Sequence, residues 1–316
     1  MDFSTKHPGG LMNCGSTCYL NTTIACMGHC IPFLRFVLEI DKHDNSLIHE
    51  LRDLLKDQWI NEHFLRPKKF LNCIENNFKE MHIYEDNDMS EFVGFLIDKL
   101  NDNIATDFVF TNKNYSNDDY DIQRCKMDEN WAKINAKCYS PLKEMFFGQT
   151  ISQLLCGNCG KIFHNYETFS TTMVSINNET NLDECLRTYF EDEIKTDWKC
   201  DSCHTVSSSS KKTLKLWRIP EIFIISLKRF NHHKKDCRKI LMPFELDVNE
   251  YSLSKTNTKY SLKAVGYHTG STHNGHYYAN VYHPDGNWYL MDDLRVQKIT
   301  APDVNTGYVY FYVYNS

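Results

Sequence analysis

GLMNCGSTCYLN, at residues 10–21, predicts a tight turn at Gly15 followed by a helix that begins at Cys18 and meets few breakers before Met27. A cysteine in the first helical turn lies at the positive end of the helix dipole, which stabilises a thiolate and lowers the pKa of the thiol. The Asn13 side-chain amide and the Cys18 backbone N–H are two candidate donors for an oxyanion hole. Taken alone, an isolated cysteine of this kind is more often a buried structural residue, and residues further along the chain favour the nucleophile instead.

A thiol nucleophile needs a histidine that takes its proton and a third group that orients the histidine. His276 opens a predicted strand, and Asp292 and Asp293 end the next strand, with the turn sequence HPDG between them. We therefore expect His276 and an aspartate to meet across one hairpin. Because His268 and His273 lie nearby, the alternative is a histidine metal site, although no glutamate occupies an HExxH position.

The length of the hairpin loop predicts which aspartate faces His276, because side chains alternate between the faces of a strand. A four-residue loop that ends at Asn287 places Asp293 on the face of His276, whereas a three-residue loop that ends at Gly286 places Asp292 there. Three-residue hairpins favour a left-handed last loop residue, a conformation that glycine adopts without strain. We therefore predict Asp292 as the orienting group and a supporting role for Asp293 near the oxyanion site, although a β-bulge would reverse the parity.

Helical signals dominate the first hundred residues, and strand signals dominate from about residue 147. Phe92, Phe95, Leu96 and Leu100 form one helical stripe at i, i+3, i+4 and i+8. Residues 101–140 are polar and predict a solvated connection. Residues rich in β-branched and aromatic types predict strands over 221–230, 260–268, 276–283, 288–291 and 308–314, interrupted earlier by a helix over 182–193. Helices followed by strands indicate an α+β fold.

The overall composition excludes several classes of protein. The 316 residues are 41% hydrophobic and 24% charged, which suits a large globular unit and not a disordered chain. A net charge of −6 argues against nucleic acid as a partner. Thirteen cysteines and a start without a signal-peptide pattern predict a reducing, intracellular compartment, the cytoplasm or the nucleus. No apolar stretch is long enough for a membrane span, so we expect no membrane partner.

Two CxxC pairs predict a metal site. Cys156 and Cys159 form the first pair, and Cys200 and Cys203 form the second. Four thiolates can close a tetrahedral zinc site with no open position for water, which makes such a zinc structural. The alternative is that some of these cysteines are free and buried.

Together these motifs resemble the ubiquitin-specific protease family of papain-like thiol peptidases, over about residues 9–312. The matching segments, in chain order, are residues 10–21, the acidic helix start at 88–92, the two CxxC pairs, LKRF at 227–230, GHY at 275–277, and WY at 288–289 before the two aspartates. The resemblance implies a right-hand architecture with a helical thumb, a β-rich palm and zinc-bearing β fingers. It implies one catalytic domain over 1–316, in which the thumb covers about 1–105, a connection about 106–145, fingers and palm strands about 146–230, and the palm with its histidine and aspartate about 231–316.

The resemblance also implies roles for individual residues. Cys18 is the expected nucleophile, His276 the general base and acid, Asp292 the orienting carboxylate and Asn13 the oxyanion donor. The expected contacts with the basic Gly-Gly tail of ubiquitin are Asp88, Glu91, Glu167, His268, Gly275 and Tyr277. For Asp88 and Glu91 the alternative is ordinary capping of a helix N-terminus. The four CxxC cysteines are expected to hold one structural zinc, and no cofactor is expected for catalysis.

The activity implied is hydrolysis of the bond after the terminal glycine of ubiquitin, through a thioester, with ubiquitin and ubiquitinated proteins as partners. A regulatory protein partner is compatible with the sequence but cannot be identified from it. Two alternatives remain: the same chemistry on another ubiquitin-like modifier, and an inactive ubiquitin-binding scaffold. Ala25, Ser90 and Met291 depart from the residues usual in the family, which affects the expected affinity and not the reaction type.

Overall fold

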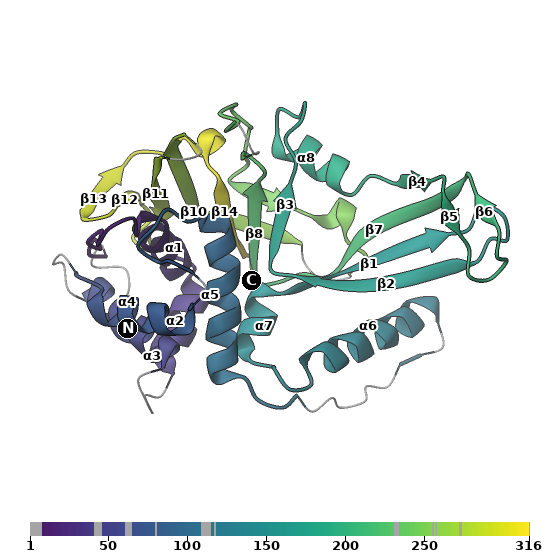
Figure 1. Ribbon diagram of the computed structural model, residues 1–316, viewed down its shortest axis with the longest axis horizontal. Coiled ribbons are helices and arrows are strands. Elements are labelled where there is room, and N and C mark those ends of the chain that lie inside the picture. Colours follow the sequence, from purple (N-terminus) through teal and green to yellow (C-terminus); the bar gives the residue numbers. More distant parts are fainter. Residues whose placement is uncertain are drawn as a thin grey trace.

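The computed structural model describes residues 8–40, 46–60, 65–79, 81–108, 115–116, 118–230, 234–254, 256, 258–271 and 274–315. Figure 1 shows three regions: a group of helices, a large sheet packed beside it, and a narrow arm of strands that extends away from both. The α+β fold class expected from the sequence is confirmed.

The helical region contains most of the first hundred residues. Its helices are α1 (Cys18–Gly28), α2 (Ile31–Glu39), α3 (Leu47–Ile60), α4 (Lys68–Asn77), α5 (Met89–Ile104) and the short α7 (Pro141–Phe146). Helix α1 is buried along its whole length, because α2 and α5 pack on it from one side and the large sheet from the other. This burial explains why α1 carries few charged or strongly polar side chains.

The predicted apolar stripe of α5 is partly wrong. Phe92, Leu96 and Leu100 are fully buried, but Phe95 is 43% exposed. Val93 and Ile97 are buried in its place, so the buried face is rotated away from Phe95. The i, i+3, i+4 pattern alone did not separate these two faces, since apolar residues occupy both.

The large sheet contains the predicted strands of the second half. Its order is β13-β12-β11-β10-β14-β8-β3, and β9 pairs with β10. All its pairs are antiparallel except β3 with β8. The strands are β3 (Thr171–Val174), β8 (Ile222–Leu227), β9 (Glu245–Asp247), β10 (Lys259–Gly270), β11 (Gly275–Tyr282), β12 (Trp288–Asp292), β13 (Arg295–Ile299) and β14 (Val309–Tyr314), with 3₁₀ turns at Asn249–Tyr251 and Val304–Thr306.

The arm is a four-stranded sheet of order β2-β1-β7-β4 with a two-stranded sheet, β5-β6, at its tip (Figure 1). The strands are β1 (Gly148–Leu155), β2 (Ile162–Phe169), β4 (Glu193–Lys195), β5 (Trp198–Lys199), β6 (Val206–Ser207) and β7 (Ser210–Arg218). Helix α8 (Leu182–Tyr189) lies near the base of the arm and ends earlier than predicted, because the chain joins the arm as β4.

The polar segment expected to be a solvated connection contains a helix, α6 (Asp119–Asn135). Asp118 caps it by accepting a hydrogen bond from the Asp121 N–H at 2.8 Å. Met127 and Trp131 are buried, and Met127 packs against the arm. The prediction was wrong because so few apolar residues anchor the helix that no helical periodicity is visible in the sequence. Among the described helices, none has the length and apolar character that crossing a membrane requires.

Candidate active site

Cys18 is the first residue of α1, and only 5% of it is exposed. Gly15 has φ +123°, a conformation that side chains rarely allow, and packs beside Tyr84. The turn is closed by the Thr17 hydroxyl, which accepts a hydrogen bond from the Cys14 N–H at 3.0 Å. The predicted tight turn before the helix is therefore confirmed.

The environment of Cys18 raises the pKa of its thiol, contrary to the expectation from the helix dipole. Burial is the main cause, and the Asp293 carboxylate acts in the same direction. The backbone N–H of Tyr277, next to His276 on β11, faces the thiol and opposes this shift. Since the resting side chain is held as a thiol, formation of the thiolate requires a base close by.

The β11–β12 hairpin has the predicted three-residue loop. Tyr282 pairs with Trp288, and the His283 N–H donates to the Asn287 carbonyl at 2.9 Å. Gly286, the last loop residue, has φ +82°, as the loop type requires. The loop is therefore three residues long, and the parity argument holds without a bulge between these strands.

This register brings Asp292 to His276. His276 Nε2 lies 2.6 Å from Asp292 Oδ1, and both side chains are about a third exposed. An Nε2–H that donates to the carboxylate leaves the lone pair on Nδ1, so the other side of the ring is available as a base.

Asp293 holds two asparagine side chains. It adopts φ +51°, and its carboxylate accepts hydrogen bonds from Asn13 Nδ2 at 3.0 Å and from Asn21 Nδ2 at 2.8 Å. The Asn13 Oδ1 accepts from the backbone N–H and the hydroxyl of Thr17. The Asn13 amide is therefore oriented from both ends, and one of its N–H bonds is left for a ligand. Asn21 was not predicted, although a buried amide one helical turn after Cys18 is a detectable signal.

The four CxxC cysteines come together at the tip of the arm, on the β1–β2 and β5–β6 turns. Their sulfur atoms all lie within 4.8 Å of one another, with Cys156 to Cys203 at 3.9 Å and Cys159 to Cys200 at 3.8 Å. Four sulfurs bound tetrahedrally at about 2.3 Å from a zinc ion are about 3.8 Å apart. The donor set and its dimensions fit one structural zinc.

Comparison with known proteins extends these observations to the whole chain. The model of the ubiquitin carboxyl-terminal hydrolase family matches residues 9–314. The chain belongs to the ubiquitin carboxyl-terminal hydrolase family. The family expected from the sequence motifs is therefore confirmed.

Two curated relatives and two solved structures illustrate the similarity to this family. Ubiquitin carboxyl-terminal hydrolase Usp2 of Drosophila melanogaster is 26% identical over 324 residues, 96% of this chain and 34% of that protein. Ubiquitin carboxyl-terminal hydrolase 2 of Homo sapiens is 27% identical over 336 residues, 98% of this chain and 55% of that protein. The chain thus spans between a third and about half of these relatives.

The solved structures support the fold alone, because their identity to this chain is low. The Ubp8 SAGA DUB module bound to monoubiquitin has a TM-score of 0.73 at 21% identity, covering 98% of this chain and 69% of that chain. A yeast SAGA DUB module has a TM-score of 0.78 at 21% identity, covering 98% and 68%. These neighbours agree with the predicted right-hand architecture.

Three of the residues that the family resemblance implied as substrate contacts lie beside His276. His268 pairs with Tyr277 across the β10–β11 ladder, and their ring centroids are 4.6 Å apart. A Cβ at Gly275 would lie 2.0 Å from His268 Nε2, so glycine is required there. Burial lowers the pKa of His268 to about 4, which keeps its ring neutral. His268 joins no potential metal cluster among the described residues, and His273 lies outside them.

The acidic residues expected to bind the tail differ in their surroundings. Asp88 caps α5, because its Oδ1 accepts from the N–H groups of Ser90 and Glu91, and its Oδ2 accepts from the Tyr308 hydroxyl at 2.7 Å. Glu91 is exposed on the first turn of α5. Glu167 lies on β2, in the sheet of the arm, whereas His276 lies on β11 of the large sheet. The Glu167 carboxylate accepts a hydrogen bond from the Asn165 side chain at 2.7 Å.

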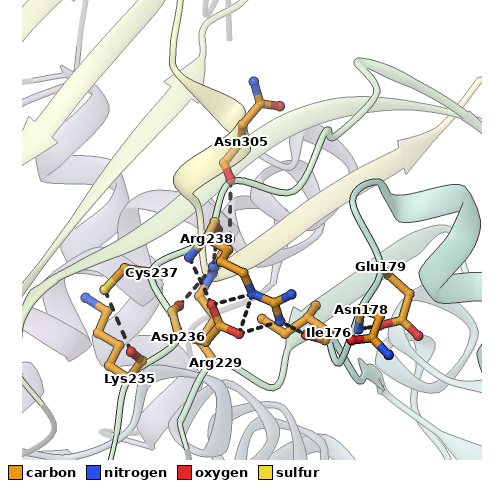
Figure 2. A network of polar contacts seen from close by, with 9 residues as sticks. All are labelled: Ile176, Asn178, Glu179, Arg229, Lys235, Asp236, Cys237, Arg238 and Asn305. Atoms are coloured by element: carbon orange, nitrogen blue, oxygen red, sulfur yellow. Dashed lines mark hydrogen bonds and ion pairs between the residues drawn. The ribbon is translucent and has the colours of Figure 1, made fainter.

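The LKRF motif supports the sheet behind the site. Arg229 is 3% exposed, and its guanidinium donates to the backbone carbonyls of Asp236, Arg238 and Asn305 (Figure 2). It also donates to the Gly307 carbonyl at 2.7 Å. The rings of the neighbouring Phe230 and of His268 pack edge to face, with their centroids 5.1 Å apart. The arginine therefore connects three segments of chain next to β10, the strand that contains His268.

Proposed function

We propose that this chain is a thiol-dependent ubiquitinyl hydrolase, a protease that cleaves the bond after the C-terminal glycine of ubiquitin. The observation that carries the proposal is the 2.6 Å contact of His276 Nε2 with Asp292, on a strand whose next N–H, that of Tyr277, faces the Cys18 thiol. A thiol, an imidazole and a carboxylate in this order form a nucleophile, a base and an orienting group. Membership of the ubiquitin carboxyl-terminal hydrolase family supports the substrate.

The proposed reaction has two halves. His276 Nδ1 takes the thiol proton as Cys18 Sγ attacks the glycine carbonyl carbon, and the oxyanion accepts hydrogen bonds from the Cys18 N–H and from Asn13 Nδ2. The same proton then passes to the departing amine as the thioester forms. In the second half His276 removes a proton from water, which attacks the thioester and releases the ubiquitin carboxylate. His276 then returns the proton to the Cys18 sulfur.

Asp292 and Asp293 have different proposed tasks. Asp292 orients His276 and stabilises its protonated form. Asp293 acts through Asn13, because its carboxylate holds the Asn13 amide in the direction of the oxyanion. The raised pKa of Cys18 makes His276 necessary for every attack, since few thiolates exist before the proton is transferred.

The tail of ubiquitin is proposed to lie between the first turn of α5 and the His268 region. Glu91, which is exposed, is the stronger candidate for pairing with a basic tail residue. Asp88 already accepts three hydrogen bonds, so its proposed contribution is to hold the turn that presents Glu91. The narrow contact of Gly275 with His268 suits a tail that ends in glycine, and Tyr277 borders the same space.

Zinc is proposed as a structural ion held by Cys156, Cys159, Cys200 and Cys203 at the tip of the arm. When bound, it links the β1–β2 and β5–β6 turns through four thiolates and takes no part in hydrolysis. No disulfide is present among the described cysteines, and a free thiol nucleophile supports an intracellular site of action, in the cytoplasm or nucleus.

We also propose the hand-like division of the single catalytic domain. In this division the thumb covers about residues 1–105 and the connection, which includes α6, about 106–145. The fingers and palm strands cover about 146–230, and the rest of the palm about 231–316. Ubiquitinated proteins would be the partners.

The test is to incubate the protein with ubiquitin that carries a C-terminal electrophile, and with the same reagent made from other ubiquitin-like modifiers. We expect one ubiquitin adduct per chain, on Cys18 by peptide mapping, and none on Cys18→Ala. A stronger adduct with another modifier would transfer the proposal to that modifier. Tight binding of ubiquitin without any adduct would indicate an inactive scaffold.

A further inference from the structure

Arg218, the last residue of β7, lies where the arm joins the rest of the molecule. Its guanidinium contacts three elements: Asp128 of α6 at 3.2 Å, Glu144 of α7 at 3.1 Å, and the Gln149 side-chain oxygen of β1 at 3.3 Å. The same group lies over the Trp131 ring, 4.5 Å from its centroid. One side chain therefore connects the arm to the helical segment that precedes it in the chain.

The Arg218–Asp128 pair is better shielded from water than an ordinary surface ion pair, whereas the Glu144 side chain is 46% exposed. The Asp128 side chain is 9% exposed and that of Arg218 is 26% exposed. Trp131 is 2% exposed, so water has little access to the side of the guanidinium that it covers. Nothing in the reaction proposed for Cys18 uses this cluster.

Helix α6 lies alongside β2 and β1 of the arm (Figure 1). Met127 of α6 packs with Ile151 and Trp217 of the arm. The Gln149 amide donates to the Met127 carbonyl at 3.4 Å, and a second link, from Gln123 to the Tyr166 hydroxyl, measures 3.3 Å. Helix α6 thus supports the base of the arm along one side. The outer part of the arm has no such support among the described residues.

The outer part of the arm exposes apolar side chains in one row. Ile162 pairs with Leu155, Leu155 with Lys211, and Lys211 with Ile194, so the four side chains share one face of the sheet. Ile162 is 48% exposed, Leu155 is 40% exposed and Ile194 is 56% exposed. Three exposed apolar residues that share one face of a projecting arm with Lys211 are typical of a contact surface for a folded protein, and the position of this face depends on the angle of the arm.

We propose that α6 and Arg218 form a brace that fixes the angle of the arm, and that Arg218 is a positioning residue for binding of the folded part of the substrate. The inference rests on the proposed function, since it takes ubiquitin as that substrate. The brace acts on binding and not on bond cleavage, because none of its members contacts Cys18, His276 or Asp292 in the described structure.

The experiment compares Arg218→Ala and Arg218→Lys with Arg187→Ala. Arg187 is the matched control, because its ion pair with Asp183 on α8 is exposed. For each variant we would measure kcat and KM on ubiquitin with a fluorescent leaving group, turnover of a short Gly-Gly reporter that cannot reach the arm, the Kd for ubiquitin in the Cys18→Ala background, and the melting temperature.

Arg218→Ala removes the bonds to Asp128, Glu144 and Gln149, and we expect it to raise KM and Kd for ubiquitin about ten-fold. Its kcat and its reporter turnover stay within two-fold of the wild type. Arg218→Lys keeps the charge but loses the planar fork, so its KM and Kd should lie between those of the wild type and of Arg218→Ala. Arg187→Ala should match the wild type. If Arg218→Ala is poorly folded, Asp128→Asn weakens the same ion pair, with the hydrogen bond from the Tyr115 hydroxyl to Asp128 as an additional contact that the variant affects.

Equal losses on ubiquitin and on the reporter would overturn the proposal, since they indicate a general loss of structure. Unchanged KM and Kd in Arg218→Ala would overturn it as well. Failure of the proposed function is a separate result: the wild-type chain itself would then neither bind ubiquitin nor form an adduct with it.

Discussion

The two adjacent aspartates of the hairpin provide the sharpest test of the proposed chemistry. We consider Asp292→Asn and Asp293→Asn, which keep the size of each side chain and remove its charge. Asp292 contacts His276, whereas the Asp293 carboxylate accepts one hydrogen bond from Asn13 and one from Asn21. An amide at 293 has one oxygen, so its NH₂ group faces one of these two donors.

The expected loss for Asp293→Asn follows from that broken contact. A hydrogen bond to a charged group contributes about 1.5–3 kcal/mol, and each 1.36 kcal/mol corresponds to about ten-fold in rate. If the cost falls on the orientation of Asn13 in the transition state, kcat drops by about ten- to a hundred-fold with little change in KM. Asp292→Asn should cost more, up to about 10⁴-fold in kcat, the loss known when a triad carboxylate is replaced by an amide.

Two assays separate the roles of the aspartates. Hydrolysis of ubiquitin with a fluorescent leaving group requires both the base and the oxyanion donors, whereas alkylation of Cys18 by iodoacetamide forms no oxyanion and requires only the thiolate. We expect Asp292→Asn to slow both reactions and Asp293→Asn to slow hydrolysis alone. Slower alkylation in Asp293→Asn than in Asp292→Asn, or a larger loss of hydrolysis in the former, would refute the assignment and make Asp293 the orienting group.

Three further predictions concern zinc, the tail and acid stability. Cys200→Ala should lose the single zinc by metal analysis and melt at a lower temperature while the Cys18 region stays intact; full zinc content would mean that the ligand set is wrong. Glu91→Ala should reduce turnover of ubiquitin but not of a short Gly-Gly reporter, and less so at high salt. Asp88→Ala should in addition lower the free energy of unfolding by about 1 kcal/mol, as loss of a helix cap does, and reduce turnover of ubiquitin more than that of the reporter, because the turn that presents Glu91 loosens. Burial lowers the pKa of His29 to about 3, so the unfolded chain binds a proton that the folded chain refuses as pH falls below about 6.5. Denaturant unfolding should therefore show a loss between pH 6.5 and about pH 5 that is smaller by about 2 kcal/mol in His29→Gln than in the wild type; equal slopes in both proteins would contradict this.

Local rules predicted the parts of the site that neighbours in the sequence determine. Gly286 selected the three-residue loop, the loop set the parity of β12, and the parity placed Asp292 on the face of His276. The turn at Gly15 and the start of α1 at Cys18 follow in the same way from steric limits on the backbone. In each case the deciding interaction spans only a few residues.

Features that depend on distant packing could not be predicted in this way. Helix α6 is held by a few contacts with an arm that follows it in the chain, and Phe95 is exposed because the fold buries Val93 and Ile97 instead. The raised pKa of Cys18 has the same origin, since burial against β11 outweighs the favourable position at the start of a helix. The sequence position of Cys18 predicted a dipole effect but contained no information on the depth of burial.

The candidate site exists only where the two ends of the chain meet. Asn13 and Asn21 reach Asp293 across 280 and 272 residues of sequence, and at the other end of α1 the ring of His29 lies 6.1 Å from that of His283 on the same hairpin. Helix α1 is thus held against the β11–β12 hairpin near both of its ends, and Cys18 and His276 lie at the N-terminal end. Neither end of the chain can hold the thiol and the imidazole at a fixed separation without the other, so we expect the catalytic geometry to form late in folding, together with the interface between the helices and the sheet.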